Sequence, residues 1–464
     1  MEKDEIDIKH GKLGMVSYGF NSFSRELLRM AFSAFGFFFY QTEVKLNVWI
    51  IALSYVIFAI YNMINDPLIG YLTNRPFKFT KKWGRRFPWI VLGGIPWGFS
   101  YILIFIPPSV DPISDAWILF IWLLFTSCLF DTFHSLFFVS FMSLFPDKYR
   151  SEQERRTASG IYIMIGVLGV ALGAIAPPLF FDYGDIPSYA FQGLMIFIIT
   201  SIGFLIGIPG SREDQPTIDL YLDSYAERPK RESFFKSLKV AVKQRPFIVF
   251  MVIYTLYQSL VETMQASVSY VVRYSFKMPE TATTLVFAAF LIGVLISSPF
   301  WTMYARKTKN NKKVMLISSF LLAAFTLPMT FLRGYIPIVI NMFVWGTALG
   351  GFWVMIFPVS SDVIDNSVVL TNKREEGIYT GFQQFFGRLG IIVQALTFAI
   401  VQTLTGFNRL VEDQTEMAIW GIHFHLSLIP TIFILIGAVV FWKWYNLTPD
   451  KITENQLKIK DLGI

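Results

Sequence analysis

The stretch NVWIIALSYVIFAIYNMINDPLIGYLTNRPFKFTKKWGRR, residues 47–86, joins a long apolar run to a loop of basic residues. The apolar part, near residues 47–73, exceeds the ~20 residues that a helix needs to cross the hydrocarbon core of a bilayer. Between Arg75 and Arg86 the loop contains six Lys or Arg residues and neither Asp nor Glu. Because Lys and Arg in short loops favour the cytoplasmic side of a membrane, this stretch predicts a transmembrane helix that ends in the cytoplasm.

The composition of the whole chain supports this prediction. Of 464 residues, 54% are hydrophobic and only 16% are charged, whereas soluble domains carry about 25% charged residues. Apolar runs bounded by charge, Pro or Gly recur along the chain and predict an all-α membrane protein with twelve transmembrane helices. The runs lie near residues 15–42, 47–73, 88–107, 115–145, 157–180, 188–209, 247–274, 281–304, 313–332, 335–361, 377–404 and 420–445.

The two halves of the chain repeat short motifs in the same order. The matching motifs are Asp66-Pro67 with Ser298-Pro299, Phe145-Pro146 with Phe357-Pro358, and Gly160-Ile161-Tyr162 with Gly377-Ile378-Tyr379. A parallel duplication of six helices is typical of the major facilitator fold. We therefore expect an N-terminal six-helix bundle over residues 1–210, a polar cytoplasmic linker over 211–246 and a C-terminal six-helix bundle over 247–464.

Other features exclude several classes of protein. The single Cys128 forbids an intramolecular disulfide, and four histidines cannot build a rich metal site. The chain contains no phosphate-binding loop of the Gly-Lys-Ser type and no spacing typical of a catalytic nucleophile, so we expect neither an ATP-driven pump nor an enzyme. The net charge of +7 is spread over separate loops, among them those at Lys148, Arg306 and Lys373, which indicates membrane topology rather than nucleic-acid binding. We expect a monomer in the cell membrane with both termini cytoplasmic and no cofactor beyond a coupling ion.

Seven charged side chains fall in or near the middle third of the predicted spans, where each ionised group costs ~2.5 to 3.5 kcal/mol on insertion scales. They are Arg25, Glu26, Arg29, Asp66, Asp131, Glu262 and Arg388. Their sum is one negative charge, which a proton, a bound cation or a cationic substrate must neutralise. The alternative is that Glu26 pairs with Arg29, that Arg388 pairs across the bundle, and that one acid is protonated.

Asp66 is the strongest candidate for a cation ligand. The following Pro67 lacks a backbone donor and frees a carbonyl one turn earlier, near Asn62 or Met63. Carboxylate, amide and carbonyl oxygens together suit a small hard cation. A helix kink in which Asp66 bonds to a neighbouring helix is the alternative.

The remaining candidates have two interpretations each. Asp131 and His134 form a proton relay or a structural hydrogen bond, and Glu262 contacts a substrate or forms a buried polar lock. Trp353 stacks on a sugar ring or packs between helices. We expect His423 and His425 to lie at the membrane interface.

Three stretches resemble the glycoside-pentoside-hexuronide:cation symporters, the melibiose-carrier branch of the major facilitator superfamily, to which the animal lysolipid symporters are related. They are NMINDPLIGYL from Asn62 through KKWGRRFPW from Lys81, YGFNSFSRE from Tyr18 with residues 40–46, and SDVIDNSVVLTNKREEGIYTGF from Ser361. The resemblance implies twelve helices, alternating access, and uptake driven by Na⁺, Li⁺ or H⁺.

The resemblance also implies roles for individual residues. Asp66 matches the second acid of the family's cation-binding pair, and Asn62 replaces the first. Arg25 and Glu26 stand where the family places a Lys-Asp pair that contacts sugar, and Arg388 stands where a lysine closes the site.

Four positions on two other spans depart from the family or match it loosely. Phe138 replaces an acid shared by cation and sugar, Met142 replaces a sugar-stacking Trp, and Tyr162 replaces an Arg that clamps substrate, while Ser135 matches a nearby Thr. These departures remove polar contacts to a disaccharide and favour a more apolar pocket.

We therefore expect a cation-coupled symporter of a glycoside or sugar-like solute. A lysolipid or amphiphile carrier and a non-transporting membrane receptor with the same fold are the alternatives. The expected cation ligands are Asp66, Asn62 and Ser135. The expected substrate contacts are Glu26, Arg25, Asp131, His134, Tyr162, Glu262, Arg388 and Trp353, and the expected cytoplasmic gate consists of Arg85, Arg86, Asp147 and Asp362.

Overall fold

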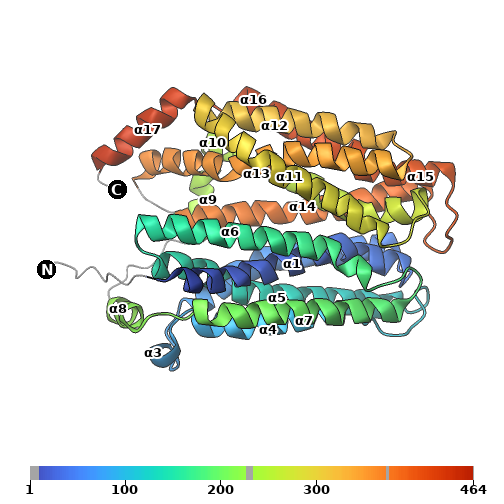
Figure 1. Ribbon diagram of the computed structural model, residues 1–464, viewed down its shortest axis with the longest axis horizontal. Helices are drawn as coiled ribbons and strands as arrows, with labels where there is room; N and C mark the ends of the chain where they lie inside the picture. Colours follow the sequence, from blue (N-terminus) through green and yellow to red (C-terminus); the bar gives the residue numbers. More distant parts are fainter. Residues whose placement is uncertain (1–9, 226–233, 373–375, 463–464) are drawn as a thin grey trace. The chain divides into compact units, whose positions relative to one another are not determined.

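The computed structural model describes residues 10–225, 234–372 and 376–462, and Arg228, Lys230, Arg231, Lys373 and Arg374 lie outside the described residues. Secondary structure in these ranges is helical, without strands (Figure 1). The long helices of the first half are α1 (Lys12–Thr42), α2 (Val48–Thr73), α4 (Phe87–Ile104), α5 (Ala116–Lys148), α6 (Glu152–Ile175) and α7 (Ile186–Gly210). Those of the second half are α10 (Arg245–Tyr270), α11 (Ala282–Thr308), α12 (Asn311–Thr326), α13 (Tyr335–Thr371), α14 (Glu376–Thr405) and the run α15 (Glu416–His423), η4 (Phe424–Leu428) and α16 (Ile429–Trp444).

The twelve predicted spans are confirmed by these helices. Eleven of them are long and apolar enough to cross a membrane by length and composition. The remaining one, α1, contains Arg25, Glu26 and Arg29 in every 18-residue stretch, so its charge rather than its length separates it from the others. Charged residues are rare at the centre of a transmembrane helix unless they have a function, so these three residues are candidates for a functional site.

Shorter helices occupy the connections. They are α3 (Thr80–Trp83) after α2, α8 (Gln215–Tyr225) and α9 (Phe234–Ala241) within the expected linker, and α17 (Pro449–Leu462) at the C-terminal end. Helix α13 extends ten residues past its predicted end at residue 361 and stops at Asn372, whose φ of 53° is left-handed. A backbone in that left-handed region is what terminates the helix.

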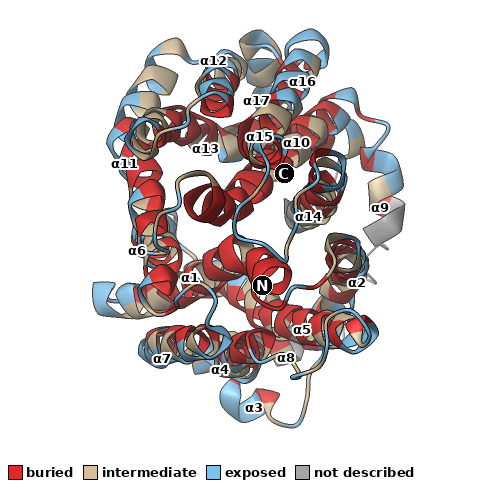
Figure 2. Ribbon diagram, turned by 90° about the vertical axis from the view of Figure 1, so that its right-hand side faces the viewer, coloured by how far each residue is buried: buried red, intermediate tan, exposed pale blue. Residues whose placement is uncertain are grey.

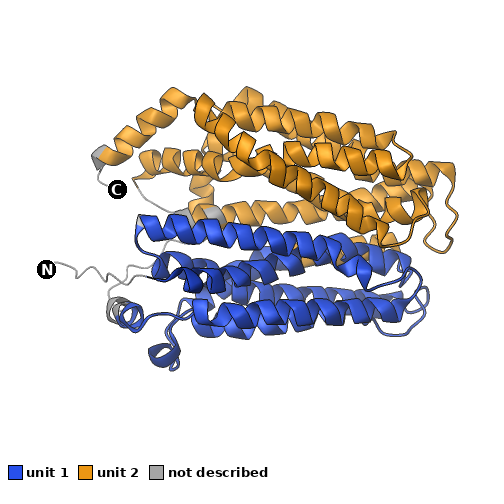
Figure 3. Ribbon diagram, in the orientation of Figure 1, with its two compact units in different colours: residues 1–46, 60–231 blue, residues 47–59, 232–464 orange. Residues whose placement is uncertain are grey.

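Two compact units divide the described chain (Figure 3). Unit 1 comprises Met1–Leu46 and Ile60–Arg231, and unit 2 comprises Asn47–Ala59 and Glu232–Ile464, so the first half of α2 is grouped with unit 2. In unit 1, α1 packs against α6 and α7, and α4 packs against α5 and α7. In unit 2, α10 packs against α14 and α16, and α13 packs against α11 and α12.

Glycines permit the closest helix contacts in both units. A Cβ at Gly169 or Gly173 of α6 would lie within 3 Å of a backbone carbonyl oxygen of α1, from Phe23 or Leu27. In unit 2, a Cβ at Gly346 of α13 would meet the carbonyl oxygen of Phe290 on α11 in the same way. Small residues therefore allow the backbones of these helix pairs to come into near contact. Close packing of this kind stabilises helix pairs in a membrane, where the hydrophobic effect does not drive them together.

The prediction that His423 and His425 are interfacial is wrong. Both side chains are fully buried in unit 2. Nδ1 of His425 lies 2.7 Å from the Ser267 hydroxyl, and Nε2 of His423 lies 2.9 Å from the Ser275 hydroxyl. His425 lies in a π-helical turn at Phe424–Leu428, and His423 directly precedes this turn, while Ser275 ends a second π-helical turn at Val271–Ser275.

Candidate functional site

A polar cluster joins the second half of α2 to the middle of α5 within unit 1. The Ser135 hydroxyl donates to Oδ1 of Asp66. Asn65 Nδ2 donates to Oδ2 of Asp131 and to Oγ of Ser135, at 3.3 Å in both cases. Asn62 Nδ2 donates to the other oxygen of Asp131, Oδ1, at 2.6 Å. Two carboxylates thus share one network of neutral amide and hydroxyl groups, an arrangement rich in oxygen ligands.

One oxygen in this cluster is left without a hydrogen bond. Asn62 is fully buried, and its Oδ1 accepts no hydrogen bond in the described part of the chain. Buried polar atoms are nearly always satisfied, so an oxygen of this kind calls for a donor or a cation that the protein itself does not supply. We refer to Asn62, Asn65, Asp66, Asp131 and Ser135 as the α2–α5 cluster.

The structure also brings together the three charges of α1. Arg25 forms an ion pair with Glu26 through Nη1, and Arg29 Nε donates to the other carboxylate oxygen of Glu26 at 3.3 Å. The predicted pairing of Glu26 with Arg29 is therefore present. The Arg25 guanidinium also lies 4.0 Å from the centre of the Phe138 ring on α5. An aromatic face in this position favours a partly buried cation.

His134 lies between these two groups. Its Nδ1 is 3.8 Å from Oδ1 of Asp131. Its ring stacks on Phe138 with centroids 5.3 Å apart and planes 9° from parallel. Asp131, His134, Phe138 and Arg25 consequently form a continuous line of contacts from the α2–α5 cluster to the charges of α1. Asp131 and His134, which we expected to contact substrate, border the predicted cation ligands.

The two other positions where this chain departs from the family lie together. The Tyr162 hydroxyl of α6 is 3.8 Å from Sδ of Met142 on α5, and the Tyr162 ring lies 6.0 Å from that of Phe141. Met142 is 38% exposed, so this part of unit 1 offers an apolar thioether and rings rather than charged groups.

The expected substrate residues of unit 2 lie on three helices. Glu262 is buried on α10, and Arg388 is half-buried on α14. Trp353 of α13 donates its indole N–H to the Tyr257 hydroxyl of α10. The hydrogen bond satisfies the indole N–H of Trp353, as both a packing and a sugar-stacking role would require.

The expected gate residues belong to different local networks. Arg85 pairs with Asp147 at 2.7 Å, whereas the Arg86 guanidinium donates to Oδ1 of Asn74 at 2.8 Å. In unit 2, Asp362 accepts from Asn311 Nδ2 at 2.9 Å.

Glu213 belongs to the same local network of unit 1 as Arg86. Its carboxylate accepts from the backbone N–H groups of Arg86 and Phe87, at 2.7 and 3.2 Å, at the start of α4. Burial raises the pKa of the Glu213 carboxyl, and burial likewise lowers the pKa of Arg86 to about 9.

Sequence reasoning missed four residues that the structure places in these networks: Asn65, Asn74, Glu213 and Tyr257. Asn65 had a usable signal, because it lies three residues after Asn62 and therefore on the same side of α2. Glu213 had none, since its partner at the start of α4 is distant in sequence.

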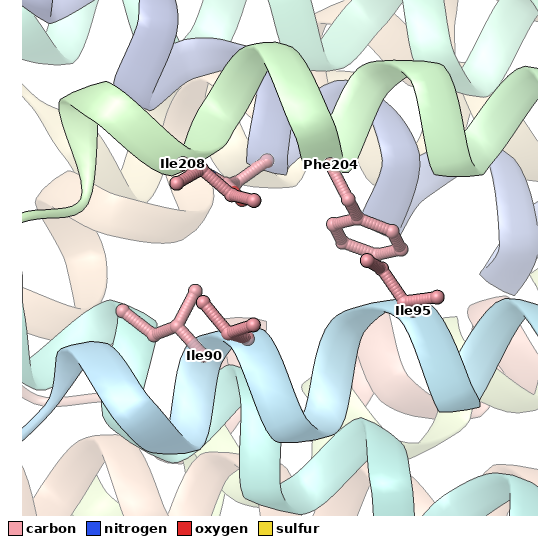
Figure 4. A pocket seen from close by; sticks show the side chains of 6 residues that line it. Ile90, Ile95, Phe204 and Ile208 are labelled. Atoms are coloured by element: carbon pink, nitrogen blue, oxygen red, sulfur yellow. The ribbon is translucent and has the colours of Figure 1, made fainter.

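A small pocket in unit 1 lies apart from these groups, between α4 and α7 (Figure 4). Its empty volume is about 210 Å³, and its lining is Asn21, Ile90, Val91, Ile95, Phe204 and Ile208. The Asn21 amide donates to the Gly207 carbonyl and the Ser211 hydroxyl. The walls of this pocket are apolar, and the Asn21 amide already donates to other groups of unit 1. The pocket therefore lacks the polar groups that orient a ligand.

Residues 17–449 match the family model described as MFS/sugar transport protein. The chain belongs to this family. Its relatives include the sodium-dependent lysophosphatidylcholine symporter 1-A of Danio rerio, 20% identical over 88% of this chain and 81% of the relative. The isoprimeverose transporter of Lactiplantibacillus pentosus is 22% identical over 95% of this chain and 91% of the relative. The sphingosine-1-phosphate transporter MFSD2B of Xenopus tropicalis is 23% identical over 85% and 80%.

The fold of this MFS/sugar transport protein is also that of a solved transporter. The crystal structure of the nucleoside transporter NupG superposes with a TM-score of 0.62 and 14% identity, over 94% of this chain and 100% of NupG. The major facilitator fold predicted from the repeated motifs is thereby confirmed. The chain is a multi-pass membrane transporter.

Proposed function

We propose that the protein is a secondary active symporter that couples movement of a glycoside or sugar-like solute to movement of an alkali cation or a proton. The α2–α5 cluster is the observation that carries this proposal. Two carboxylates and the unsatisfied Asn62 Oδ1 lie in one buried network. A cation bound among them removes the cost of buried negative charge.

The chemistry of the cluster assigns roles to its members. Asp66 and Asp131 supply charge, Asn62 and Ser135 supply neutral oxygens, and Asn65 fixes the spacing between the two acids. Carboxylates of this kind attract either Na⁺, Li⁺ or a proton. Two relatives named as sodium-dependent symporters support a metal cation.

Cation and solute movement are coupled because the protein closes readily only when both the α2–α5 cluster and the solute site are occupied. An empty cluster places two carboxylates in one buried network within the membrane, and their negative charge resists the closure that alternating access requires. Solute contacts at Arg25 and Glu26 then join the cluster through His134 and Phe138. We further propose that Glu262, Arg388 and Trp353 contact the solute from unit 2.

Uptake into proteoliposomes tests the cation site. Asp66→Asn removes the charge and keeps the shape, and we expect it to abolish stimulation of solute uptake by Na⁺, Li⁺ or acid pH. Asp115→Asn, at the start of α5 and outside the cluster, is the matched control. Cation-stimulated uptake that survives Asp66→Asn would contradict the assignment.

A second solute class is favoured by one observation. The Arg25 guanidinium lies on Phe138, and its buried Nε has no hydrogen-bond partner among the described residues. With Met142 and Tyr162 nearby, these groups suit a solute that joins a polar head to an apolar body, such as a lysolipid. Thermal-shift measurements with glycosides and lysolipids, each with and without Na⁺, separate the two classes, because the true solute stabilises the protein.

We also propose that the protein is a monomer in the cell membrane with both termini in the cytoplasm. The basic residues of the loop after α2 support this orientation. In a Cys128→Ser background, a single cysteine introduced at Lys82 should be labelled by an impermeant maleimide only after the membrane is opened. One introduced at Asp182 should be labelled in intact cells, and the reverse pattern would invert the topology.

A further inference from the structure

The loop between α2 and α4, residues 75–86, separates its basic residues into two groups. Arg85 and Arg86 are buried and hydrogen-bonded within unit 1. Arg75, Lys78, Lys81 and Lys82 are exposed. None of these four lies within 4 Å of a carboxylate in the part of the chain that the structure describes, and the loop itself has no acidic residue. Arg75 donates to the Tyr71 hydroxyl and lies over its ring, and Lys82 lies over the Trp83 ring, so the described residues give these cations aromatic rather than acidic neighbours.

Aromatic side chains alternate with these cations. Phe77 stacks on Phe79 with ring centroids 5.2 Å apart, and both rings lie edge-on to Trp89. Trp83 is 43% exposed, while the backbone N–H of Phe77 donates to the Thr80 hydroxyl at 2.9 Å. These contacts give the loop an ordered surface with aromatic rings at defined positions, which distinguishes it from a solvated basic tail.

This surface directly follows exposed apolar and aromatic residues of α2. Leu68 and Tyr71, in the last turns of α2, are 61% and 64% exposed. Tyr and Trp at the end of an apolar helix mark the level of the lipid headgroups. Figure 2 shows α3, which contains Lys81, Lys82 and Trp83, exposed at the edge of unit 1.

We propose that residues 75–83 form a binding site for the headgroups of anionic phospholipids. The phosphates accept from Arg75, Lys78, Lys81 and Lys82, while Trp83 and Tyr71 lie among the headgroups and glycerol backbones. Basic clusters immediately beside a transmembrane helix are attracted to anionic lipid, by an amount that grows with each charge near the surface. Because Arg85 of the same loop holds Asp147, lipid bound here also stabilises the network at this end of unit 1.

Unit 2 supplies a matched control. The end of α11, the start of α12 and the short connection between them contain exposed Arg306, Lys307, Lys309 and Lys313, but no aromatic residue lies between Arg306 and Lys313. The triple variant Lys307→Gln, Lys309→Gln, Lys313→Gln thus removes the same charge as Lys78→Gln, Lys81→Gln, Lys82→Gln. A difference between them reports a site rather than net charge.

Native mass spectrometry and thermal shift of the full chain with phosphatidylglycerol test the proposal. We expect the Lys78/Lys81/Lys82 variant to bind phosphatidylglycerol at least about tenfold more weakly than the wild type. We expect Trp83→Ala to weaken it as well, and the Lys307/Lys309/Lys313 variant to retain most of it. Equal losses in both triple variants, no loss in either, or the same stabilisation by inorganic phosphate would overturn the proposal.

Discussion

The imidazole of His134 lies parallel to the ring of Phe138, with 5.3 Å between centroids, while its Nδ1 is 3.8 Å from Asp131. One side chain thus contacts both the carboxylate of the α2–α5 cluster and the ring beneath Arg25. If the α2–α5 cluster binds the cation and α1 contacts the solute, as we propose, His134 is the side chain placed between the two sites. We therefore predict that His134 links cation binding to solute binding.

His134→Phe tests that linkage, because it keeps the stacking and removes the ring nitrogens. We expect solute to bind without cation as in the wild type, while the tightening of solute binding by cation falls by about fivefold or more. Solute affinity measured with and without Na⁺ on the purified variant gives this ratio. His134→Gln, which retains a donor toward Asp131, should keep more of the linkage. An unchanged ratio in His134→Phe would remove His134 from the coupling path.

Asn62→Asp adds a third carboxylate to the α2–α5 cluster. Asn62 Nδ2 now donates to Asp131 at 2.6 Å, so an aspartate there would replace a hydrogen bond by repulsion between like charges. We expect a lower melting temperature without Na⁺ and a larger Na⁺-induced increase than in the wild type. Thermal shift in sodium chloride against N-methylglucamine chloride measures both. Asn62→Leu, which removes the oxygen, should lose the Na⁺ response, and a smaller response in Asn62→Asp would contradict the assignment.

The number of helices, their order and the duplication were predictable because apolar runs and repeated Pro motifs are local signals. The pairing of Glu26 with Arg29 followed from helical spacing for the same reason. The participation of Asp131 in the α2–α5 cluster did not follow, because it depends on how α5 is rotated against α2. The helical spacing of Asn62, Asn65 and Asp66 on α2 could not indicate which turn of α5 they meet.

Buried polar residues near helix ends were the least predictable. His423 and His425 lie near the start of a span, where composition favours an interfacial position, yet both side chains are fully buried, one directly before and one within a π-helical turn. Glu213 lies in a stretch that reads as linker, but its carboxylate caps α4. Such contacts join residues far apart in sequence, and a single sequence contains no signal for them.

Glu213 should make stability depend on pH. Burial raises the pKa of its carboxyl above the value in the unfolded chain, so the folded protein favours the protonated form. The wild type therefore gains stability from this group as pH falls from neutral through its folded pKa, and loses it as pH rises. Glu213→Gln keeps an oxygen to accept from Arg86 and Phe87 but cannot titrate.

We therefore compare the melting temperatures of the wild type and of Glu213→Gln. The wild-type value minus the variant value should become larger as pH is lowered from about 8 to about 5, a range that includes a raised carboxyl pKa. Asp219→Asn on α8 controls for the loss of an acid, because this carboxylate accepts from Gln215 on the same helix and from no other described residue. A constant or decreasing difference would show that Glu213 is not held in an unfavourable charged form.

Gly169 of α6 tests the closeness of the α1–α6 contact. An added Cβ would lie within 3 Å of the Phe23 carbonyl oxygen, and backbone cannot move aside as a flexible side chain can. We expect Gly169→Ala to destabilise the protein by about 1 to 3 kcal/mol, the usual cost of overpacking. Gly160→Ala on the same helix is the control, because nothing lies within 4 Å of its Cβ and alanine favours a helix. Chemical unfolding of both variants in detergent measures the difference. Equal stability would mean that α1 and α6 can separate freely, and then their tight contact could not position Arg25 and Glu26 toward the solute.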